Sequence, residues 1–428
     1  MKNLPVLMIC LFAAFGLNAQ EKGDTPQYGI SFSGFVKTDF FYDFRQMVNI
    51  REGNFTLYPE NVKPDLNGKD LNAKDQFGIL SIQSRLSGKL TGPNVMNAKT
   101  SGLIEADFFG NENGNFSDVN GFRLRHALVR INWSSTELLA GQFWHPLFVH
   151  ECFPDVVSFN TGAPFQPFSR NPQLRVTQKL NHFRLVGAIA GQRDFTSNGP
   201  EGSSSRYLRQ SALPDLNLHL QFHQPWNEKL ELLAGAGFEY KEITPRLFSI
   251  ADKITSNGAD SLFDASGDKA DSWAAAAYAK LRLKPVTFKL YGIYGGNLFD
   301  LVMLGGYATG AITDTLQKRT EYMPVRTLSC WTEIQTNGKI QAGLFAGFSK
   351  NLGTDGENTG TYYSRGSNIR DIYRVSPRIV FNFEKLRIAA EIEYSHARYG
   401  KANKSGVVDT DLKDVSGLRT LVAFYYFF

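Results

Sequence analysis

The sequence has no long hydrophobic run after its N-terminal segment, which argues against a membrane-spanning helix. The best candidate, WAAAAYAKLRL at 273–283, carries charges and is shorter than the roughly 18 apolar residues that such a helix needs. Two hydrolase motifs, G-x-S-x-G and H-E-x-x-H, are also absent. The formal net charge is a mild +5, which gives no reason to expect nucleic acid as a partner. We therefore expect a protein that is not an enzyme and that needs no cofactor.

Cysteine is scarce as well. Cys10 lies in the segment MKNLPVLMICLFAAFGLNAQ, which has the basic start, apolar centre and small or polar end of a secretory signal peptide. We predict a cleaved signal peptide over residues 1–20 and a single domain over residues 21–428. Cys152 and Cys330 lie far apart in the remaining chain, so two unpaired thiols are expected rather than a disulfide.

What the chain does have is alternation of apolar and polar residues, together with an aromatic content of 13%. An exported chain without a spanning helix can still cross a membrane as a β-barrel, whose strands alternate and whose aromatic residues form girdles at both interfaces. The alternating segments number about sixteen, an even number within the range of bacterial barrels. These predicted strands are 29–43, 76–90, 98–109, 121–133, 136–143, 173–180, 182–191, 214–223, 229–240, 272–283, 286–297, 327–336, 338–349, 371–382, 385–398 and 417–428.

The connections between these segments alternate between short and long. Short ones include SST, KP and TNG, whereas long ones such as GNENGNFSDVNG are rich in Gly, Asn, Asp and Ser. This order is typical of a transmembrane antiparallel barrel with short periplasmic turns and long extracellular loops, and a soluble sandwich has no reason to keep it. The final segment LRTLVAFYYFF, 418–428, would then be the last strand, with Val422, Phe424 and Phe428 toward lipid.

The opposite face of each predicted strand is polar. In 385–399, for example, Leu386 and Ile388 alternate with Arg387 and Glu391, and in 76–90 the alternation places Gly78, Leu80, Ile82 and Leu86 on the outer face. An Arg or Lys facing lipid at the membrane centre costs about 2–4 kcal/mol, so the charged faces should line an aqueous lumen. Basic residues exceed acidic ones in this inward set, and a narrow basic passage favours anions.

The candidate residues of this passage come from several predicted strands and one loop. The strand at 121–133 carries charges on both faces, so its register stays open between Arg123 and His126. The candidate residues for the solute pathway are Arg85, Arg123, Arg125, Arg175, Arg378, Arg387, Glu105, Asp107, Glu151 and Asp155.

The third long connection, FWHPLFVHECFPDVVSFNTGAPFQPFSRNPQ at 143–173, is too apolar for a free surface loop. We expect it to fold into the barrel and narrow the lumen, with Glu151 and Asp155 opposite wall arginines. Packing against a neighbouring subunit is the alternative. His145, His150 and Glu151 could in principle bind a metal ion, but ordinary packing is the expected role and no metal site is predicted.

Between about residues 30 and 180 the chain resembles the DcaP-like trimeric porins. The resemblance is carried by SGFVKTDFFYDF, SIQSRLSGKL, SGLIEADFFG, FRLRHALVRINW, LLAGQFWHPL, PDVVSFNTGAP and RNPQLRVTQKL. It implies a sixteen-stranded barrel assembled as a homotrimer, passive uptake of small and often anionic solutes such as dicarboxylates, and pore-facing arginines at Arg85, Arg123, Arg125 and Arg175. Phosphate-selective porins share part of the pattern, and the chain has no room for the N-terminal helical extension of some family members.

Taken together, these observations predict a porin of a Gram-negative outer membrane, in contact with lipid and with small hydrophilic or anionic solutes. A phosphate- or oligophosphate-selective porin, an outer-membrane barrel enzyme and a transporter of apolar substrates are the alternatives. A terminal aromatic such as Phe428 resembles the signal by which the last strand of such barrels engages the barrel assembly machinery.

Overall fold

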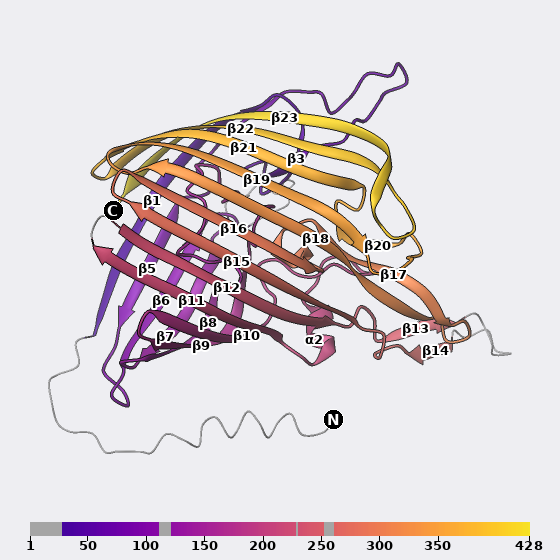
Figure 1. Ribbon diagram of the computed structural model, residues 1–428, viewed down its shortest axis with the longest axis horizontal. Coiled ribbons are helices and arrows are strands. Elements are labelled where there is room, and N and C mark those ends of the chain that lie inside the picture. The colour runs from indigo at the N-terminus through magenta and orange to yellow at the C-terminus, as the bar shows by residue number, and fades with distance from the viewer. Residues whose placement is uncertain (1–27, 111–120, 228–229, 252–260) are drawn as a thin grey trace.

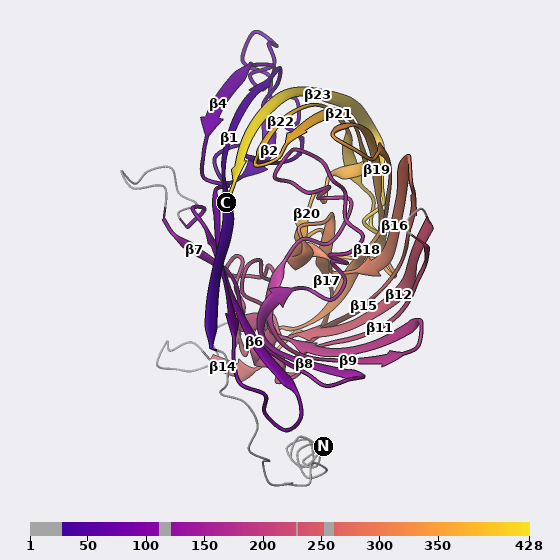
Figure 2. The ribbon, with the colours of Figure 1, turned by 90° about the vertical axis from the view of Figure 1, so that its left-hand side faces the viewer.

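The computed structural model describes residues 28–110, 121–227, 230–251 and 261–428. Its strands close into one antiparallel barrel of sixteen wall positions, seen from the side in Figure 1 and nearly end-on in Figure 2. This confirms the predicted fold class. Within the described ranges no helix is both long and apolar enough to cross a membrane. The predicted signal peptide, residues 1–20, lies outside the described residues.

The wall strands follow chain order around the barrel, and β4 and β5 share one position because both pair with β1. The wall strands are β1 (Gly29–Asp43), β4 (Gln76–Leu80), β5 (Arg85–Thr91), β6 (Lys99–Asp107), β7 (Arg123–Asn132), β8 (Thr136–Trp144), β9 (Arg170–Leu180), β10 (Phe183–Ala190), β11 (Asp215–Asn227), β12 (Leu230–Ile243), β15 (Ala270–Leu283), β16 (Val286–Gly296), β18 (Arg319–Thr336), β19 (Ile340–Thr354), β21 (Ile369–Phe383), β22 (Leu386–Ala402) and β23 (Val408–Phe427).

The remaining elements lie in the long connections, all at one end of the barrel. Strands β17 and β20 pair with each other. Strand β17 also pairs with the first residues of β18, and β18 begins earlier than predicted. These elements are β2 (Met47–Ile50), β3 (Phe55–Pro59), α2 (Arg206–Ser211), β13 (Phe248–Ala251), β14 (Ser261–Asp264), η1 (Phe299–Leu301), β17 (Gly305–Asp314) and β20 (Tyr362–Arg365).

The last strand closes the barrel against the first. Strand β23 pairs with β1 from Phe35↔Phe427 to Asp43↔Arg419. Beyond this ladder, Gly34 and Phe428 exchange two backbone hydrogen bonds, each 3.2 Å long. The apolar C-terminal run is thus the closing seam of the wall, which leaves no open sheet edge at this position.

Outward-pointing strand side chains are mostly apolar and exposed, as an exterior in contact with lipid hydrocarbon requires. The predicted outer face of the last strand is among them. Examples are Val36 and Phe40 of β1, Leu218 and Leu220 of β11, Leu344 of β19, Ile379 of β21, and Val422, Phe424 and Tyr426 of β23.

The predicted faces of 76–90 are wrong for its first half. Phe77 and Ile79 are the exposed residues there, at 76% and 57%, whereas Ile82 is buried at 6%. Between Leu80 and Arg85 the chain advances five residues while its partner β1 moves only four, from Asp39 to Phe35. The extra residue is a bulge, and it reverses the inward and outward positions, so that Gly78, Leu80 and Ile82 face inward.

A second register shift settles the strand that carries charges on both faces. The β6–β7 pairing slips between Glu105 and Ala106, so that Glu105 pairs with His126 while Ala106 pairs with Leu124. Arg125 and His126 are consequently both buried, at 2% and 4%, although they are neighbours in sequence. Leu124 stays exposed at 49%. The bulge explains why charges fall on both predicted faces of this strand. With the bulge in place, its charged side chains all point inward.

The hydrophobic core of the molecule lies inside the barrel at the end of the long connections. Phe55 of β3, Leu147 and Phe168 of the third long connection, and Leu301 of η1 belong to one buried cluster. Because these residues come from three separate connections, the long connections fold inward and pack against one another as well as against the wall.

Candidate functional site

The connection between β8 and β9, residues 145–169, folds into the lumen as predicted (Figure 2). We call it the inner loop. Side chains of the wall bind its backbone: Lys37 Nζ donates to the carbonyl of Val157 at 2.9 Å, and Glu391 accepts from the Val157 N–H at 2.5 Å. Further along, Arg374 donates to the carbonyl of Ala163 at 3.0 Å. Inward charges of β1, β21 and β22 are therefore used to hold the inner loop.

Close packing completes this attachment. The Ser329 hydroxyl donates to the carbonyl of Phe165 at 3.0 Å. The Phe165 ring lies over Gly347, where an added Cβ would come within 2.5 Å of the ring. A side chain at position 347 would thus push the inner loop away from the wall, and glycine is the residue that allows the close approach.

Three adjoining cavities lie between the inner loop and the short-turn end of the barrel, with volumes of about 390, 260 and 440 Å³. Glu151 and Arg184 line both the first and the second, and Asp155 and Gln335 line both the first and the third. We call them together the chamber. Its basic lining residues are Arg85, Arg125, Arg130, Arg175, Lys179, Arg184, Lys280, Arg282, Lys289 and Arg387, against the acidic Glu137, Glu151, Asp155 and Glu231.

Several of the predicted pathway arginines are neutralised by carboxylates. Asp107 accepts from Arg123 at 2.8 Å and from Arg125 at 2.7 Å. Glu105 accepts from Arg125 at 2.8 Å and lies 3.7 Å from Arg85. In this row of ion pairs along β5, β6 and β7, positive and negative charges alternate, so its net field is weaker than the arginines alone would produce. Arg378 is paired in the same way with Glu333 of β18, at 2.9 Å.

A carboxylate that is not among the predicted site residues extends this row. Asp194, in the connection after β10, lies 2.6 Å from Arg170, 3.2 Å from Arg51 and 3.5 Å from Arg123. Burial alone would raise its pKa, but Arg170, Arg51 and Arg123 hold the pKa of the Asp194 carboxyl well below its usual range. Nothing near Asp194 in the sequence marks this role, because its partners come from three other segments.

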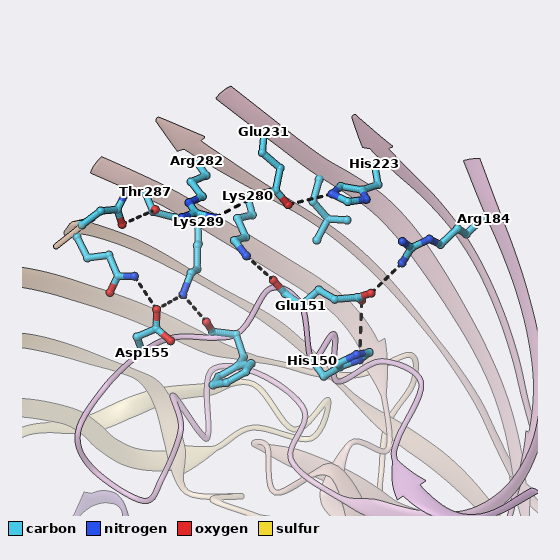
Figure 3. A pocket seen from close by; sticks show the side chains of 14 residues that line it. His150, Glu151, Asp155, Arg184, His223, Glu231, Lys280, Arg282, Thr287 and Lys289 are labelled. Carbon is cyan, nitrogen blue, oxygen red and sulfur yellow. Dashed lines mark hydrogen bonds and ion pairs between the residues drawn. The ribbon is translucent and has the colours of Figure 1, made fainter. Parts of the chain in front are cut away.

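The two predicted acidic residues of the inner loop both point toward the wall, as Figure 3 shows. Glu151 accepts from Arg184 at 3.0 Å, in line with the expectation of a wall arginine. Asp155 instead accepts from Lys289 at 2.6 Å and from the Gln335 amide at 2.7 Å. The expected arginine is only an indirect partner of Asp155: Arg378 donates to Gln335, which in turn donates to Asp155. The register of β16 against β18 places Lys289 beside Glu333, which also accepts from the Asp155 N–H at 2.9 Å.

These contacts keep both inner-loop carboxyls charged. Burial alone would raise their pKa values. Contacts with His150, Gln221 and Arg184 nevertheless lower the pKa of Glu151 below its ordinary value. For Asp155 it is chiefly Lys289 that lowers the pKa, against the same effect of burial. Both side chains are therefore ionised at neutral pH and hold the inner loop by charge-assisted hydrogen bonds.

Two other predicted arginines keep uncompensated charge toward the chamber. Arg175 donates to Gln173 at 2.9 Å and to the carbonyl of Trp144 at 2.8 Å, and Arg387 donates to Asn382 at 2.8 Å. In the described part of the chain, neither has a carboxylate within ion-pair distance. Arg387 also lies over the ring of Phe427, with 5.2 Å to the ring centroid, which holds the guanidinium in place without cancelling its charge.

Cys152 and Cys330, the cysteines of the described residues, are unpaired, as expected. Cys152 lies in the inner loop, where burial raises the pKa of its thiol to about 12. His145, His150 and Glu151, for which ordinary packing was expected, do not come together in one group. His150 lies 3.8 Å from Glu151, whereas His145 lies 3.6 Å from Glu239 on the barrel wall.

The chain forms a closed sixteen-stranded barrel, and its third long connection narrows the lumen. These two features define the porin fold. Among solved structures, the chain is similar to the outer membrane channel DcaP of Acinetobacter baumannii, with a TM-score of 0.65 and 17% identity over 94% of this chain and 97% of that one. The expected resemblance to DcaP-like porins is confirmed at the level of the fold.

A second similarity is to OmpT, an outer membrane protein of Vibrio cholerae. Its outer-membrane-expressed form has a TM-score of 0.51 and 11% identity over 95% of this chain and 99% of that one. The trimer form folded in vitro has a TM-score of 0.52 and 11% identity over 94% and 99%. No protein-family model and no curated protein sequence matches this chain.

Proposed function

We propose that this protein is a passive channel of a Gram-negative outer membrane for small hydrophilic solutes, with a preference for anions such as dicarboxylates. The observation that carries the proposal is the chamber beneath the inner loop, where arginines and lysines outnumber carboxylates. A basic cavity with low-dielectric walls raises the local concentration of anions. The name of the structural neighbour DcaP, an outer membrane channel, supports the same function.

Within the chamber, we assign anion recognition to Arg175 and Arg387, which lack a carboxylate partner in the described chain. We add Arg85, because its carboxylate neighbour Glu105 is 3.7 Å away and is bound more closely by Arg125. A guanidinium stays charged and presents a planar fork that fits carboxylate and phosphate groups. Aromatic rings hold these side chains: Arg85 lies over Phe35 at 5.1 Å and Arg175 over Phe143 at 5.4 Å. We assign Arg123, Arg125, Arg378, Glu105 and Asp107 to shaping the wall of the pathway, because their charges are largely paired.

The same proposal places the short turns on the periplasmic side and the long connections outside the cell, as in other outer-membrane barrels. We propose a homotrimer, which the trimer form of the OmpT neighbour supports. We propose transport rather than catalysis, since the similar structures are named as a channel and as outer membrane proteins. Phe428, in the closing seam, is proposed as the contact with the barrel assembly machinery.

The first experiment is the reversal potential of the purified protein in a planar bilayer under a potassium chloride gradient. We expect open steps and a potential that favours chloride. The double variant Arg85→Gln/Arg387→Gln should lower the chloride-to-potassium permeability ratio by about threefold or more, because each lost charge weakens the basic excess of the chamber.

A matched control removes positive charge elsewhere. Lys401 and Lys404 are exposed at the long-connection end of β22 and in the turn that follows it, so Lys401→Gln/Lys404→Gln changes net charge equally without touching the chamber. Unaltered selectivity of the chamber variant, or equal loss in both variants, would contradict the anion assignment. Competition by inorganic phosphate that is stronger than competition by a dicarboxylate would favour a phosphate-selective channel.

A further inference from the structure

A cluster of buried polar side chains joins the start of the inner loop to the barrel wall. His145 directly follows β8, Asp215 is the first residue of β11, and Glu239 lies on the neighbouring β12. One possible ligand atom from each of these three residues lies within 4.8 Å of the others. All three side chains are at most 2% exposed. None of them lines the chamber, so the cluster is separate from the proposed solute pathway.

The atoms that face one another in this cluster lack partners. In the described part of the chain, neither carboxylate oxygen of Asp215 accepts a hydrogen bond, and Oε1 of Glu239 and Nε2 of His145 are likewise unsatisfied. A buried polar atom without a partner is costly, and native structures satisfy the great majority of them. Four such atoms on three converging side chains indicate a ligand that accepts lone pairs from all of them.

The local charges point to the same conclusion. The carboxyl groups of Asp215, Glu239 and the nearby Asp300 lie around a single lysine ammonium, that of Lys241. The Lys241 ammonium is committed to Asp300, at 2.5 Å, and lies 3.9 Å from Glu239. The cluster therefore has an excess of carboxyl groups over ammonium groups in a buried place. A divalent cation between Asp215 and Glu239 would compensate that excess.

The donor set and its spacing fit a first-row divalent ion. One imidazole nitrogen with carboxylate oxygens is a common ligand set for zinc, whose ligand bonds of about 2.0–2.1 Å put neighbouring ligands roughly 3.4 Å apart in a tetrahedron. The distance from His145 Nε2 to Glu239 Oε1 is 3.6 Å. The backbone N–H of Leu147 lies 3.2 Å from Nδ1 of His145. A metal on Nε2 requires the ring proton on Nδ1, so this contact must open on binding.

We propose that Asp215, Glu239 and His145 form a binding site for a divalent transition-metal ion, with zinc as the reference ion, that ties the inner loop to strands β11 and β12. We assign no catalytic role to this metal ion. Its effect is to hold the residue from which the inner loop departs, since His145 belongs to the inner loop and the other two ligands belong to the wall.

The test uses the full-length protein in detergent micelles, stripped with EDTA and then incubated with excess zinc. After gel filtration, elemental analysis should find about one zinc per chain, and zinc should raise the melting temperature of the stripped protein. Replacement by cobalt(II) should give visible absorption bands of a low-symmetry site. Asp215→Asn should reduce retained zinc by about tenfold or more and abolish the cobalt bands.

His150→Gln is the matched control for His145→Gln, because His150 belongs to the same loop but faces the chamber. Zinc retention should fall only in His145→Gln. Heat-modifiable migration on gels checks that each variant is folded, and a folded Asp215→Asn or His145→Gln variant that still retains zinc overturns the proposal.

The rival explanation is a proton shared between the Asp215 and Glu239 carboxyls. It predicts that the stripped wild-type protein retains no zinc above the level of a buffer blank, shows no zinc-dependent melting shift, and is no more stable than Asp215→Asn. That combination also overturns the metal site. Conductance in the planar bilayer is measured separately, so failure of the metal site leaves the proposed channel function untouched.

Discussion

At the scale of single residues, two groups of inward charges differ from the carboxylate-paired arginines and from each other in what they contact. Lys37 and Glu391 bind backbone groups of the inner loop, while Arg175 and Arg387 lack a carboxylate partner in the described chain and face the chamber. Removing a partner from a buried charge typically costs about 3–5 kcal/mol, so we expect changes in the first group to affect folding. Changes in the second group should affect selectivity.

The inner-loop carboxyls lead to a prediction about acid. Because the folded-state pKa values of Asp155 and Glu151 are lowered, their stabilisation is complete above the ordinary values of 3.8 and 4.5 and is lost as the pH falls through the lower folded values. Single-channel recordings should therefore show steady currents from about pH 8 to about pH 5 and added flickering below about pH 4.

The variant Asp155→Asn is the control for the effect of acid on the single-channel currents. It keeps the size of the side chain but loses the charge that pairs with Lys289, so flickering should be present already at neutral pH, and acidification should add only the effect of neutralising Glu151. Flickering in the wild-type protein that begins near neutral pH would contradict this account, because neither carboxyl titrates there.

At the scale of elements, the interior of the barrel is built from connections that the wall brings together. Arg374 of β21 illustrates this. Its guanidinium donates to the carbonyl of Leu57 in β3 at 2.7 Å and to the carbonyl of Ala163 in the inner loop at 3.0 Å. It also lies 3.6 Å from Glu393 of β22. One buried side chain thus joins two long connections to two wall strands.

Arg374→Lys should loosen both connections while keeping the positive charge near Glu393. A lysine ammonium is a point charge without the planar fork, so it cannot reach the same set of acceptors. We expect a larger and noisier single-channel conductance, together with a lower melting temperature. Arg398→Lys is the control, because Arg398 on β22 is half-exposed and pairs with the exposed Asp414. Conductance unchanged in Arg374→Lys would show that the two connections do not limit the current.

At the scale of the whole molecule, closure depends on the seam between β1 and β23. Gly34 and Phe428 hydrogen-bond across its end. A Cβ on Gly34 would lie 2.1 Å from the carbonyl oxygen of Arg85 and 2.9 Å from the Phe428 ring. The three strands that meet here therefore require a residue without a side chain at position 34.

Deletion of Phe428, and separately Gly34→Ala, should lower the amount of folded, heat-modifiable protein in the outer membrane. Deletion removes the last backbone pairing of the seam, and the added methyl group forces β1 and β5 apart. Gly187→Ala is a suitable control, since a Cβ at that strand position would meet nothing within 4 Å. Wild-type levels for both seam variants would contradict a role of this seam in assembly.

The sequence by itself determined the number of wall strands, the order of short and long connections up to β22, and the strand character of the C-terminal segment. These features depend on alternation within one segment and on the composition of the next turn, so they are local. The long connection expected at 399–416 was wrong, because β22 continues to Ala402 and β23 begins at Val408. The apolarity of residues 143–173 was enough to predict that this loop folds inward, because its apolar side chains need a surface to pack against.

Only the tertiary structure decided which inward-facing charged side chains lack an ion-pair partner and which are neutralised by one. The bulge before Arg85 reversed the faces of half a strand, and Asp194 reached arginines from three other segments. His145 met Asp215 and Glu239 rather than its sequence neighbours His150 and Glu151. The physical reason is that a single inserted residue reverses every later side chain of a strand, and that ion pairs inside a barrel join strands and loops far apart in the sequence.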